Sequence, residues 1–445
     1  MKKQNKQTMT KLAVFAGATA LASLATQARA QSSDALIDKL VEKGVLTVNE
    51  AKDLRDEADK DFKTAFQAKT GMPDWVSGYK FSGDVRGRLD HISGDNNLMI
   101  DRLRLRYRVR FGVTVNMLDN LEAGLRLGSG DSAGNPLSNN TTAENNFSKK
   151  PIWVDTAYGK WTAINSAGWL LSTTIGKMDN PFAFTPMVFD PDLTPEGAAI
   201  QGSYLINDKH TVAFNGGAFV MDEEKSNTHD PMMYGGQVLW NAKWNAKWAS
   251  SVGVGAFQIV NPEQLSNANV AQNNQGNTRT GGGLLLNNYN PIIADASVTY
   301  TLDSFPFYTG AFPIKFAGEY IENPGASKNN TGYWAGVTFG KSGTKRTWDL
   351  SYRYEYLEAD AWYDQLVDDD NGAFYQNAPT GGAAGYFGGT NVKGHLVKLN
   401  YSFTDSFSFA CSFFMNDLIN QTVYSNVAEP NSPTLRVMAD LMWKF

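Results

Sequence analysis

The stretch Asp101–Met117 alternates strictly between apolar and other side chains. One set of alternate positions is apolar throughout: Leu103, Leu105, Tyr107, Val109, Phe111, Val113 and Val115. The interleaved set begins with five arginines: Arg102, Arg104, Arg106, Arg108 and Arg110. A period of two over this length predicts one long β-strand with an apolar face and a polar face. Five arginines on one face do not fit a packed protein core, because each guanidinium needs a partner or water.

Both faces are accommodated if the apolar one meets lipid and the arginine one lines a water-filled lumen. This alternation is typical of strands in outer-membrane β-barrels. The same period recurs from Trp75 to Phe445 and predicts sixteen strands in all. Their expected ranges are 75–90, 101–116, 120–129, 152–161, 169–178, 197–206, 210–220, 232–241, 248–259, 291–302, 313–322, 331–340, 347–358, 392–403, 406–416 and 434–445.

The links between these strands alternate in length, with one near-tie between 303–312 and 323–330. The short set is 117–119, 162–168, 207–209, 242–247, 303–312, 341–346 and 404–405. The long set is 91–100, 130–151, 179–196, 221–231, 260–290, 323–330, 359–391 and 417–433. In an antiparallel barrel this alternation places all short turns at one end and all long loops at the other. Outer-membrane barrels have short periplasmic turns and long external loops. The fold class expected is therefore an all-β transmembrane barrel of about sixteen antiparallel strands.

The start of the chain indicates export. Four lysines precede a mostly apolar run from Leu12 to about Ala25, and Ala28-Arg29-Ala30 follows as a cleavage pattern. Residues 1–30 are thus expected to be a signal peptide. They hold five basic and no acidic residues, so the remaining chain has 35 basic and 45 acidic residues and a net charge of −10. This acidic balance argues against a nucleic-acid partner, and the single Cys411 excludes an intramolecular disulfide framework.

Residues 31–70 have a helical rather than a two-residue period. Asp34–Lys43 forms one short pattern that ends at Gly44, and Thr47-Val-Asn-Glu50 has the form of a capping box that opens a second helix. We expect this segment to be periplasmic, either as a self-packed helical hairpin or as a coiled coil joining neighbouring chains. The barrel is expected over residues 75–445.

Several segments together resemble the bacterial putative porin family and, in architecture, sixteen-stranded general porins. They are Leu36–Gly44, the arginine-rich strand, Gly176–Phe182, Asp190–Gly197 and the terminal Phe445. The resemblance implies passive diffusion of small hydrophilic solutes, a homotrimer in the bacterial outer membrane, and contact with lipid and lipopolysaccharide. A terminal Phe on an amphipathic strand is also similar to the signal by which the barrel assembly machinery recognises such barrels. No particular solute is implied.

The arginines of the first three strands form the strongest candidate for a functional surface. They are expected to face inward together as a lumen wall: Arg86, Arg88, Arg102, Arg104, Arg106, Arg108, Arg110 and Arg126. Charged lumen walls decide which ions pass. The alternative is that these arginines pair with acids and only brace the wall. The four acids on the same strands are too few to neutralise eight arginines: Asp84, Asp90, Asp101 and Glu122. The wall therefore predicts mild selectivity, leaning to anions.

By the same resemblance, the link 179–196 is expected to fold into the lumen as a constriction. It carries the acids Asp179, Asp190, Asp192 and Glu196. Four prolines stiffen it, because the proline ring fixes the backbone angle φ: Pro181, Pro186, Pro191 and Pro195. The alternative is an ordinary external loop with solvated acids.

Enzyme functions find little support in the sequence. The four histidines have no metal-ligand spacing, Gly340-Lys341-Ser342 lacks the preceding glycine of a phosphate loop, and Asp368-Asp369-Asp370 lacks the spacing of a calcium loop. We therefore expect no catalytic residues, no metal and no cofactor. The main alternative to a diffusion channel is a closed or plugged barrel that acts in adhesion or envelope attachment.

Overall fold

The computed structural model describes most of the strands and many of the links. The described residues are 37, 39–43, 46–47, 50–54, 57, 73–94, 101–132, 134–225, 227–265, 275–281, 283–371, 374–375, 386–387, 389–420 and 433–445. The predicted signal peptide therefore lies outside them. The chain divides into two units, Met1–Val76 and Ser77–Phe445.

In the first unit, the described residues at 37, 39–42, 50–54 and 57 are helical. The capping box predicted from the sequence is present: the Thr47 backbone N–H donates to Glu50 Oε2 at 2.8 Å, and the Glu50 N–H donates to Thr47 Oγ1 at 3.3 Å. The two bonds satisfy backbone donors that a helix start leaves open. None of the helices described is long and apolar enough to cross a membrane.

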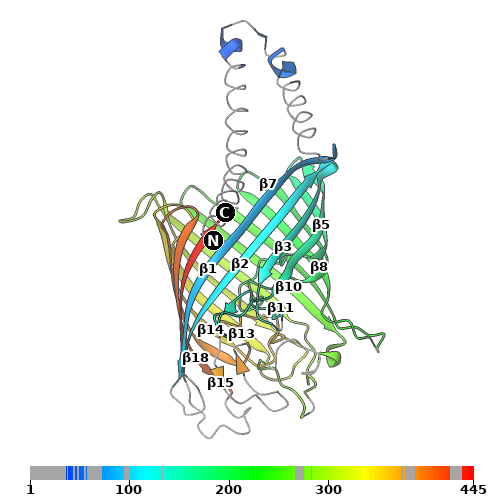
Figure 1. Cartoon of the computed structure of the whole chain (residues 1–445), viewed down its shortest axis with the longest axis vertical. Coiled ribbons are helices and arrows are strands. Elements are labelled where there is room, and N and C mark those ends of the chain that lie inside the picture. Colours follow the sequence, from blue (N-terminus) through cyan, green and yellow to red (C-terminus); the bar gives the residue numbers. More distant parts are fainter. Residues whose placement is uncertain are drawn as a thin grey trace, which may run out of the picture. The chain divides into compact units, whose positions relative to one another are not determined.

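The second unit is a closed antiparallel β-barrel (Figure 1). Among the described residues it has sixteen long strands: β1 (Val76–Gly94), β2 (Arg102–Met117), β3 (Leu121–Ser129), β5 (Ile152–Ser166), β6 (Trp169–Lys177), β7 (Glu196–Asn207), β8 (His210–Val220), β9 (Met232–Lys243), β10 (Trp248–Val260), β11 (Ile292–Leu302), β12 (Phe312–Glu322), β13 (Thr331–Gly340), β14 (Thr347–Leu357), β17 (Val392–Ser402), β18 (Phe407–Leu418) and β19 (Thr434–Lys444). The predicted strand number is confirmed. Three two-residue strands lie within links: β4 (Thr141–Thr142), β15 (Phe374–Tyr375) and β16 (Tyr386–Phe387).

Strand β1 closes the barrel by pairing with β19, from Asp84 opposite Lys444 to Gly94 opposite Thr434. The pairing continues past β19, because the backbone of Phe445 exchanges two hydrogen bonds with Gly83, at 2.9 and 3.1 Å. A Cβ at Gly83 would lie 2.4 Å from the Arg110 carbonyl and 2.5 Å from the Phe445 ring. Glycine at position 83 is therefore what lets the Phe445 ring cover the seam, the junction at which β1 pairs with β19.

The links between the long strands alternate in length, as the sequence predicts, except that 303–311 has nine residues and the following link 323–330 has eight. The short ones are 118–120, 167–168, 208–209, 244–247, 303–311, 341–346 and 403–406. They lie at the end of the barrel drawn uppermost in Figure 1, opposite the end that carries the longer links. The turn at 118–120 is tight because Asp119 and Asn120 adopt φ values of 60° and 59°, which Asp and Asn tolerate better than most residues. The boundary expected at 162–168 is corrected to a two-residue turn at 167–168, since β5 continues to Ser166.

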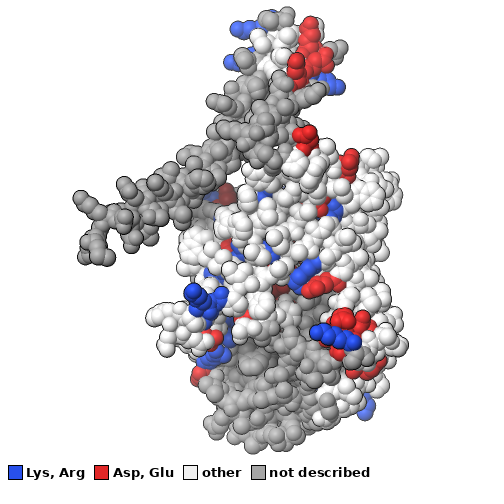
Figure 2. Space-filling model, turned by 45° about the vertical axis from the view of Figure 1, so that its right-hand side comes forward, with Lys and Arg blue, Asp and Glu red and all other residues white. Residues whose placement is uncertain are grey.

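The two faces of β2 separate as the period of two predicts. Leu103 and Leu105 on the outer face have exposed fractions of 66% and 63%. Arg108 on the inner face has an exposed fraction of only 6%. In the view of Figure 2 most of the described barrel wall is free of charged side chains. Apolar side chains outside and polar ones inside are the arrangement that a barrel in lipid requires.

Several links fold against the inner face of the wall, and two of them pack against each other. In the link 178–195, the Ala183 N–H donates to Gln237 on β9 at 2.9 Å and the Thr185 N–H donates to Glu319 on β12 at 3.2 Å. In the link after β14, Trp362 Nε1 donates to the Val188 carbonyl at 2.9 Å. The two links share one apolar cluster with the strand residues around them, including Met187, Val188, Phe257, Ile321, Trp362 and Tyr363. This cluster fills the lumen on the side of β8 to β12.

Candidate functional site

The arginines predicted to face inward lie on the inner face of β1, β2 and β3, and a further one, Arg436, lies on β19. We call the following set the arginine ladder: Arg86, Arg88, Arg104, Arg106, Arg108, Arg110, Arg126 and Arg436. The ladder is continuous because β19, β1, β2 and β3 are neighbours in the closed barrel. Arg102 differs from the ladder, since it is exposed at the start of β2 and has no ion pair among the described residues.

Every arginine of the ladder has at least one carboxylate within 4.0 Å. Asp84 joins Arg108 and Arg110 at 2.9 and 2.8 Å. Asp90, which is fully buried, joins Arg104 and Arg436 at 2.7 and 2.9 Å. The carboxylates in these pairs are Asp84, Asp90, Asp155, Asp179, Asp192, Asp370 and Asp440. Seven acids thus face eight arginines, and the ladder is close to neutral.

Two of the acids expected to pair with the arginines do so, and two do not. Asp84 and Asp90 are in the ladder, whereas Asp101 accepts a bond from the Gly94 N–H at 3.3 Å. Glu122 accepts from the Tyr158 hydroxyl at 2.8 Å. The other ladder acids come from strands and links distant in the sequence. Asp440 shows why: it lies directly opposite Arg88 in the β1–β19 pairing, and its Oδ1 accepts from Arg88 Nε at 2.8 Å.

The four acids expected on the constriction link lie in four different environments. Asp192 contacts the ladder, with Oδ1 at 3.2 Å from Arg108 Nη1. Asp179 Oδ1 lies 2.6 Å from Arg126 Nη2. Glu196 is the first residue of β7 and pairs with Lys177 at 2.9 Å, away from the ladder. Asp190 is buried at the junction of the two inward links, where its N–H donates to the Leu366 carbonyl at 2.8 Å.

Asp190, Asp368 and Asp369 form a cluster in which one carboxylate oxygen from each lies within 4.8 Å of the others. Burial and the charge of Asp369 raise the pKa of Asp190 well above its ordinary value. Burial and the charge of Asp370 raise the pKa of Asp369 to about 8. Three close carboxylates need either a cation or bound protons. Asp370 differs, because burial disfavours its charge but Arg436 and Arg88 outweigh that effect and lower its pKa.

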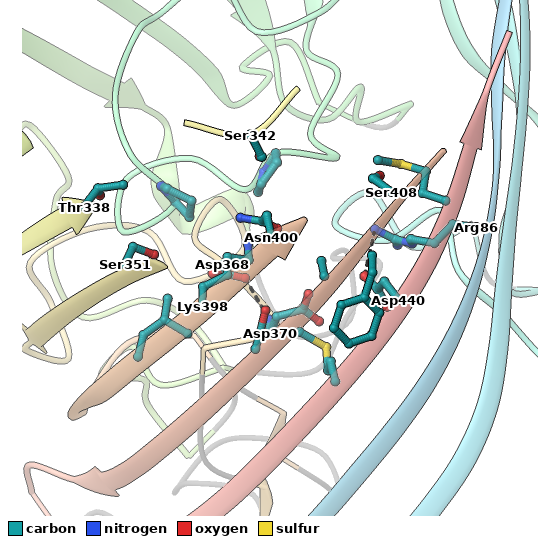
Figure 3. A pocket seen from close by; sticks show the side chains of 18 of the residues that line it. Arg86, Thr338, Ser342, Ser351, Asp368, Asp370, Lys398, Asn400, Ser408 and Asp440 are labelled. Carbon is teal, nitrogen blue, oxygen red and sulfur yellow. Dashed lines mark hydrogen bonds and ion pairs between the residues drawn. The ribbon is translucent and has the colours of Figure 1, made fainter. Parts of the chain in front are cut away.

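A polar cavity of about 520 Å³ remains beside the ladder (Figure 3). Three of the predicted wall residues line it: Arg86, Arg88 and Arg108. Asp190 and Asp192 line it from the inward link, and Asp368, Asp369 and Asp370 line it from the link after β14. The adjoining wall comes from β12 to β18 and carries Arg353 and the lysines Lys315 and Lys398. The other predicted wall residues, Arg102, Arg104, Arg106, Arg110 and Arg126, are not among the lining residues.

The sequence did not predict that Arg436, Asp440 and Asp370 belong to the charged network of the lumen wall. It also did not predict that the link after β14 folds inward. One signal was available, because closure of a sixteen-stranded barrel makes the first and last strands neighbours and so brings Asp440 and Arg436 to the ladder. No comparable signal marks Asp370, since a long link can fold inward or outward with the same composition.

Comparisons with known proteins agree with this geometry. The model of a family described as putative porin matches residues 92–282, which confirms the resemblance predicted from the sequence. A search of curated proteins found no match. Among solved structures, the high-pH structure of Pseudomonas putida OprB matches with a TM-score of 0.50 and 10% identity, over 83% of this chain and 94% of that one. This likeness concerns the fold.

A triple mutant of the Rhodopseudomonas blastica porin also matches, with a TM-score of 0.41 and 10% identity, over 83% of this chain and 100% of that one. The family match and the closed barrel indicate a porin-like barrel of the bacterial outer membrane.

Proposed function

We propose that this chain is a porin through which small hydrophilic solutes and ions diffuse passively across the outer membrane. One observation carries the proposal: the polar cavity is lined by residues from a long link at one end of the barrel and from short links at the other end. Leu137 and Asn140 line it from a long link, and Ser342 and Ser406 line it from two short links. A polar passage inside a barrel with an apolar exterior is what a diffusion channel needs.

The link 178–195 is proposed to be the constriction. It crosses from β6 to contacts with Gln237 on β9, Glu319 on β12 and Arg108 on β2. The ion pair between Asp192 and Arg108 holds one end of this link against the ladder, and the apolar cluster holds its middle against the strands around it. The resemblance to general porins supports this role for the link.

The remaining expectations from the sequence complete the proposal. Residues 1–30 direct export, and residues 31–70 form a periplasmic helical segment. The barrel assembly machinery recognises Phe445. A homotrimer, surrounded by lipid and lipopolysaccharide, is the assembly that the resemblance favours. The lumen-wall and constriction roles of the residues named above belong to the same proposal.

A closed or plugged barrel is the second candidate, and the apolar cluster favours it. Met187, Val188 and Trp362 are fully buried where an open lumen would hold water. Stepwise conductance of the purified, folded protein in planar lipid bilayers separates the two functions. We expect discrete steps in KCl; a folded barrel that inserts and passes no current would instead support the plugged form.

A further inference from the structure

Five residues form one row across the neighbouring strands β12, β13, β14, β17 and β18, the last of which pairs with the ladder strand β19. Lys315 on β12 pairs with Thr338 on β13, and Thr338 pairs with Ser351 on β14. Ser351 pairs with Lys398 on β17, which pairs with Ser412 on β18. All five line the cavity, and Figure 3 shows Thr338, Ser351 and Lys398 on adjacent strands at its side. We call this set the lysine–hydroxyl row.

The row differs from the ladder in having no partners. Among the described residues, none of its five side chains makes a hydrogen bond or an ion pair within 4.0 Å, and Asp295 interacts with Lys315 only at longer range. Both lysines are exposed although they face inward. The ladder arginines beside the cavity are buried, with side-chain exposed fractions of 12%, 5% and 7% for Arg86, Arg88 and Arg108. Water in the cavity therefore meets the lysines more readily than the arginines.

The chemistry of the row suits an oxyanion. Each ammonium group supplies a charge and three donors, and each hydroxyl supplies one donor more. Adjacent strands are about 4.8 Å apart, so the Cα atoms of Lys315 and Lys398 are roughly 14 Å apart with two hydroxyls between them. An oxyanion leaving one ammonium group meets hydroxyl donors before the next. Several weak sites in series permit passage, because no single site holds the solute too tightly.

We propose that the lysine–hydroxyl row binds the oxyanions of small carboxylate- or phosphate-bearing solutes inside the lumen. The proposal rests on the proposed function, because it takes the chain to be a diffusion channel and names the solutes that the channel prefers. It assigns the discrimination between solutes to Lys315 and Lys398, and it leaves the ladder as the brace of the adjoining wall. The ladder, although richer in positive charge, has its charge compensated by the seven aspartates.

Equilibrium binding to the full chain in detergent micelles tests the row directly. Succinate and inorganic phosphate are titrated separately by calorimetry, with uncharged succinamide as a third probe. We expect at least one oxyanion to bind, succinamide not to bind, and the variant Lys315→Gln/Lys398→Gln to lose about tenfold or more in affinity, since each charge-assisted bond contributes more than a neutral one. The two oxyanions show whether carboxylate or phosphate is preferred.

A matched control removes two lysines outside the cavity. Lys247 and Lys341 lie in short links, are exposed and do not line it. Lys247→Gln/Lys341→Gln should bind as the wild type does, and Lys315→Arg/Lys398→Arg should retain most of the affinity because it keeps the charge. Equal binding by the wild type and Lys315→Gln/Lys398→Gln, equal binding of succinamide and succinate, or no oxyanion binding by the wild type would overturn the proposal.

Conductance separates this proposal from the proposed function. In planar bilayers under a KCl gradient, Lys315→Gln/Lys398→Gln should shift the reversal potential toward cations and weaken the block by succinate about tenfold. A conducting wild type with an unaffected variant would reject the row and leave the porin function intact. A wild type that binds succinate through the row but passes no current would reject the porin function and leave the binding site intact.

Discussion

The two charged faces of the lumen differ in how their charges are held. The arginine ladder carries eight guanidinium groups, all paired with carboxylates. Beside the cavity, the wall from β12 to β18 carries three cations, as many as the ladder does, and two of them, Lys315 and Lys398, are exposed and without ion pairs among the described residues. A solute responds to uncompensated local charge, because salt screens distant charges and a paired charge has little external field. The number of basic residues on a strand is therefore a poor measure of its effect on a passing ion.

The largest expected effect comes from removing an acid that holds the ladder together. Asp90→Ala leaves Arg104 and Arg436 without their shared buried carboxylate. Breaking a buried pair on one side costs about 3–5 kcal/mol, since it leaves an uncompensated charge. We expect the heat-modifiable folded form to be lost at clearly lower urea concentration than in the wild type.

Asp303→Ala is the matched control, because Asp303 pairs with Lys247 in an exposed pair on the short-link side. That loss should be much smaller than the loss for Asp90→Ala, because an exposed ion pair contributes little to stability. Equal stability of the two variants would show that the ladder does not brace the wall.

A smaller effect should separate two positions within the ladder. Arg108 lines the cavity and Arg104 does not. Arg108→Gln removes charge beside the passage and leaves Asp84 and Asp192 less compensated, so the reversal potential in a KCl gradient should move toward cations. We expect this shift to be at least about twice that of Arg104→Gln, since short-range charges escape screening.

The shift in reversal potential for Arg108→Gln should be smaller than that for Lys315→Gln/Lys398→Gln, if the unpaired lysines affect a passing ion more than the paired arginines do. An equal or larger shift for Arg104→Gln would mean that the passage follows the whole β2 strand.

The smallest effect concerns pH and the junction of the inward links. Asp369 has a folded-state pKa raised to about 8 by burial and by Asp370, so the folded protein keeps a proton that the unfolded chain releases near pH 4. Stability should therefore fall as pH rises from about 4 to about 8 and then level off. Asp369→Asn, which is neutral throughout, should lessen this fall in urea midpoints measured at pH 5, 7 and 9.

The charged groups near Asp369 include the following residues: Asp190, Asp368, Asp370, Arg106 and Arg436. Asp190 has a raised pKa of its own, so part of the pH dependence should remain in the variant. An identical pH profile for Asp369→Asn and the wild type would show that Asp369 holds no proton at neutral pH.

The sequence was most informative where a local pattern determines the outcome. Alternation predicted the strands, link lengths predicted the two barrel ends, and Thr47 with Glu50 predicted a helix start that the hydrogen bonds confirm. The sequence could not predict which acids pair with the arginines of the ladder, because Asp370 contacts Arg88 from a link 282 residues away. Lys315 and Lys398 lie on otherwise ordinary strands. Only the register across β12, β13, β14 and β17 shows that they share a row.

The seam between β1 and β19 also has a kinetic consequence. Arg88 and Asp440 are 352 residues apart, so the contact that completes the cylinder has the longest loop to close and forms against the largest entropy. Until then both edge strands present unpaired backbone groups, which favour aggregation. A variant such as Gly83→Leu, which obstructs the Phe445 ring, should therefore slow the last step of folding and prolong the life of an open, aggregation-prone sheet.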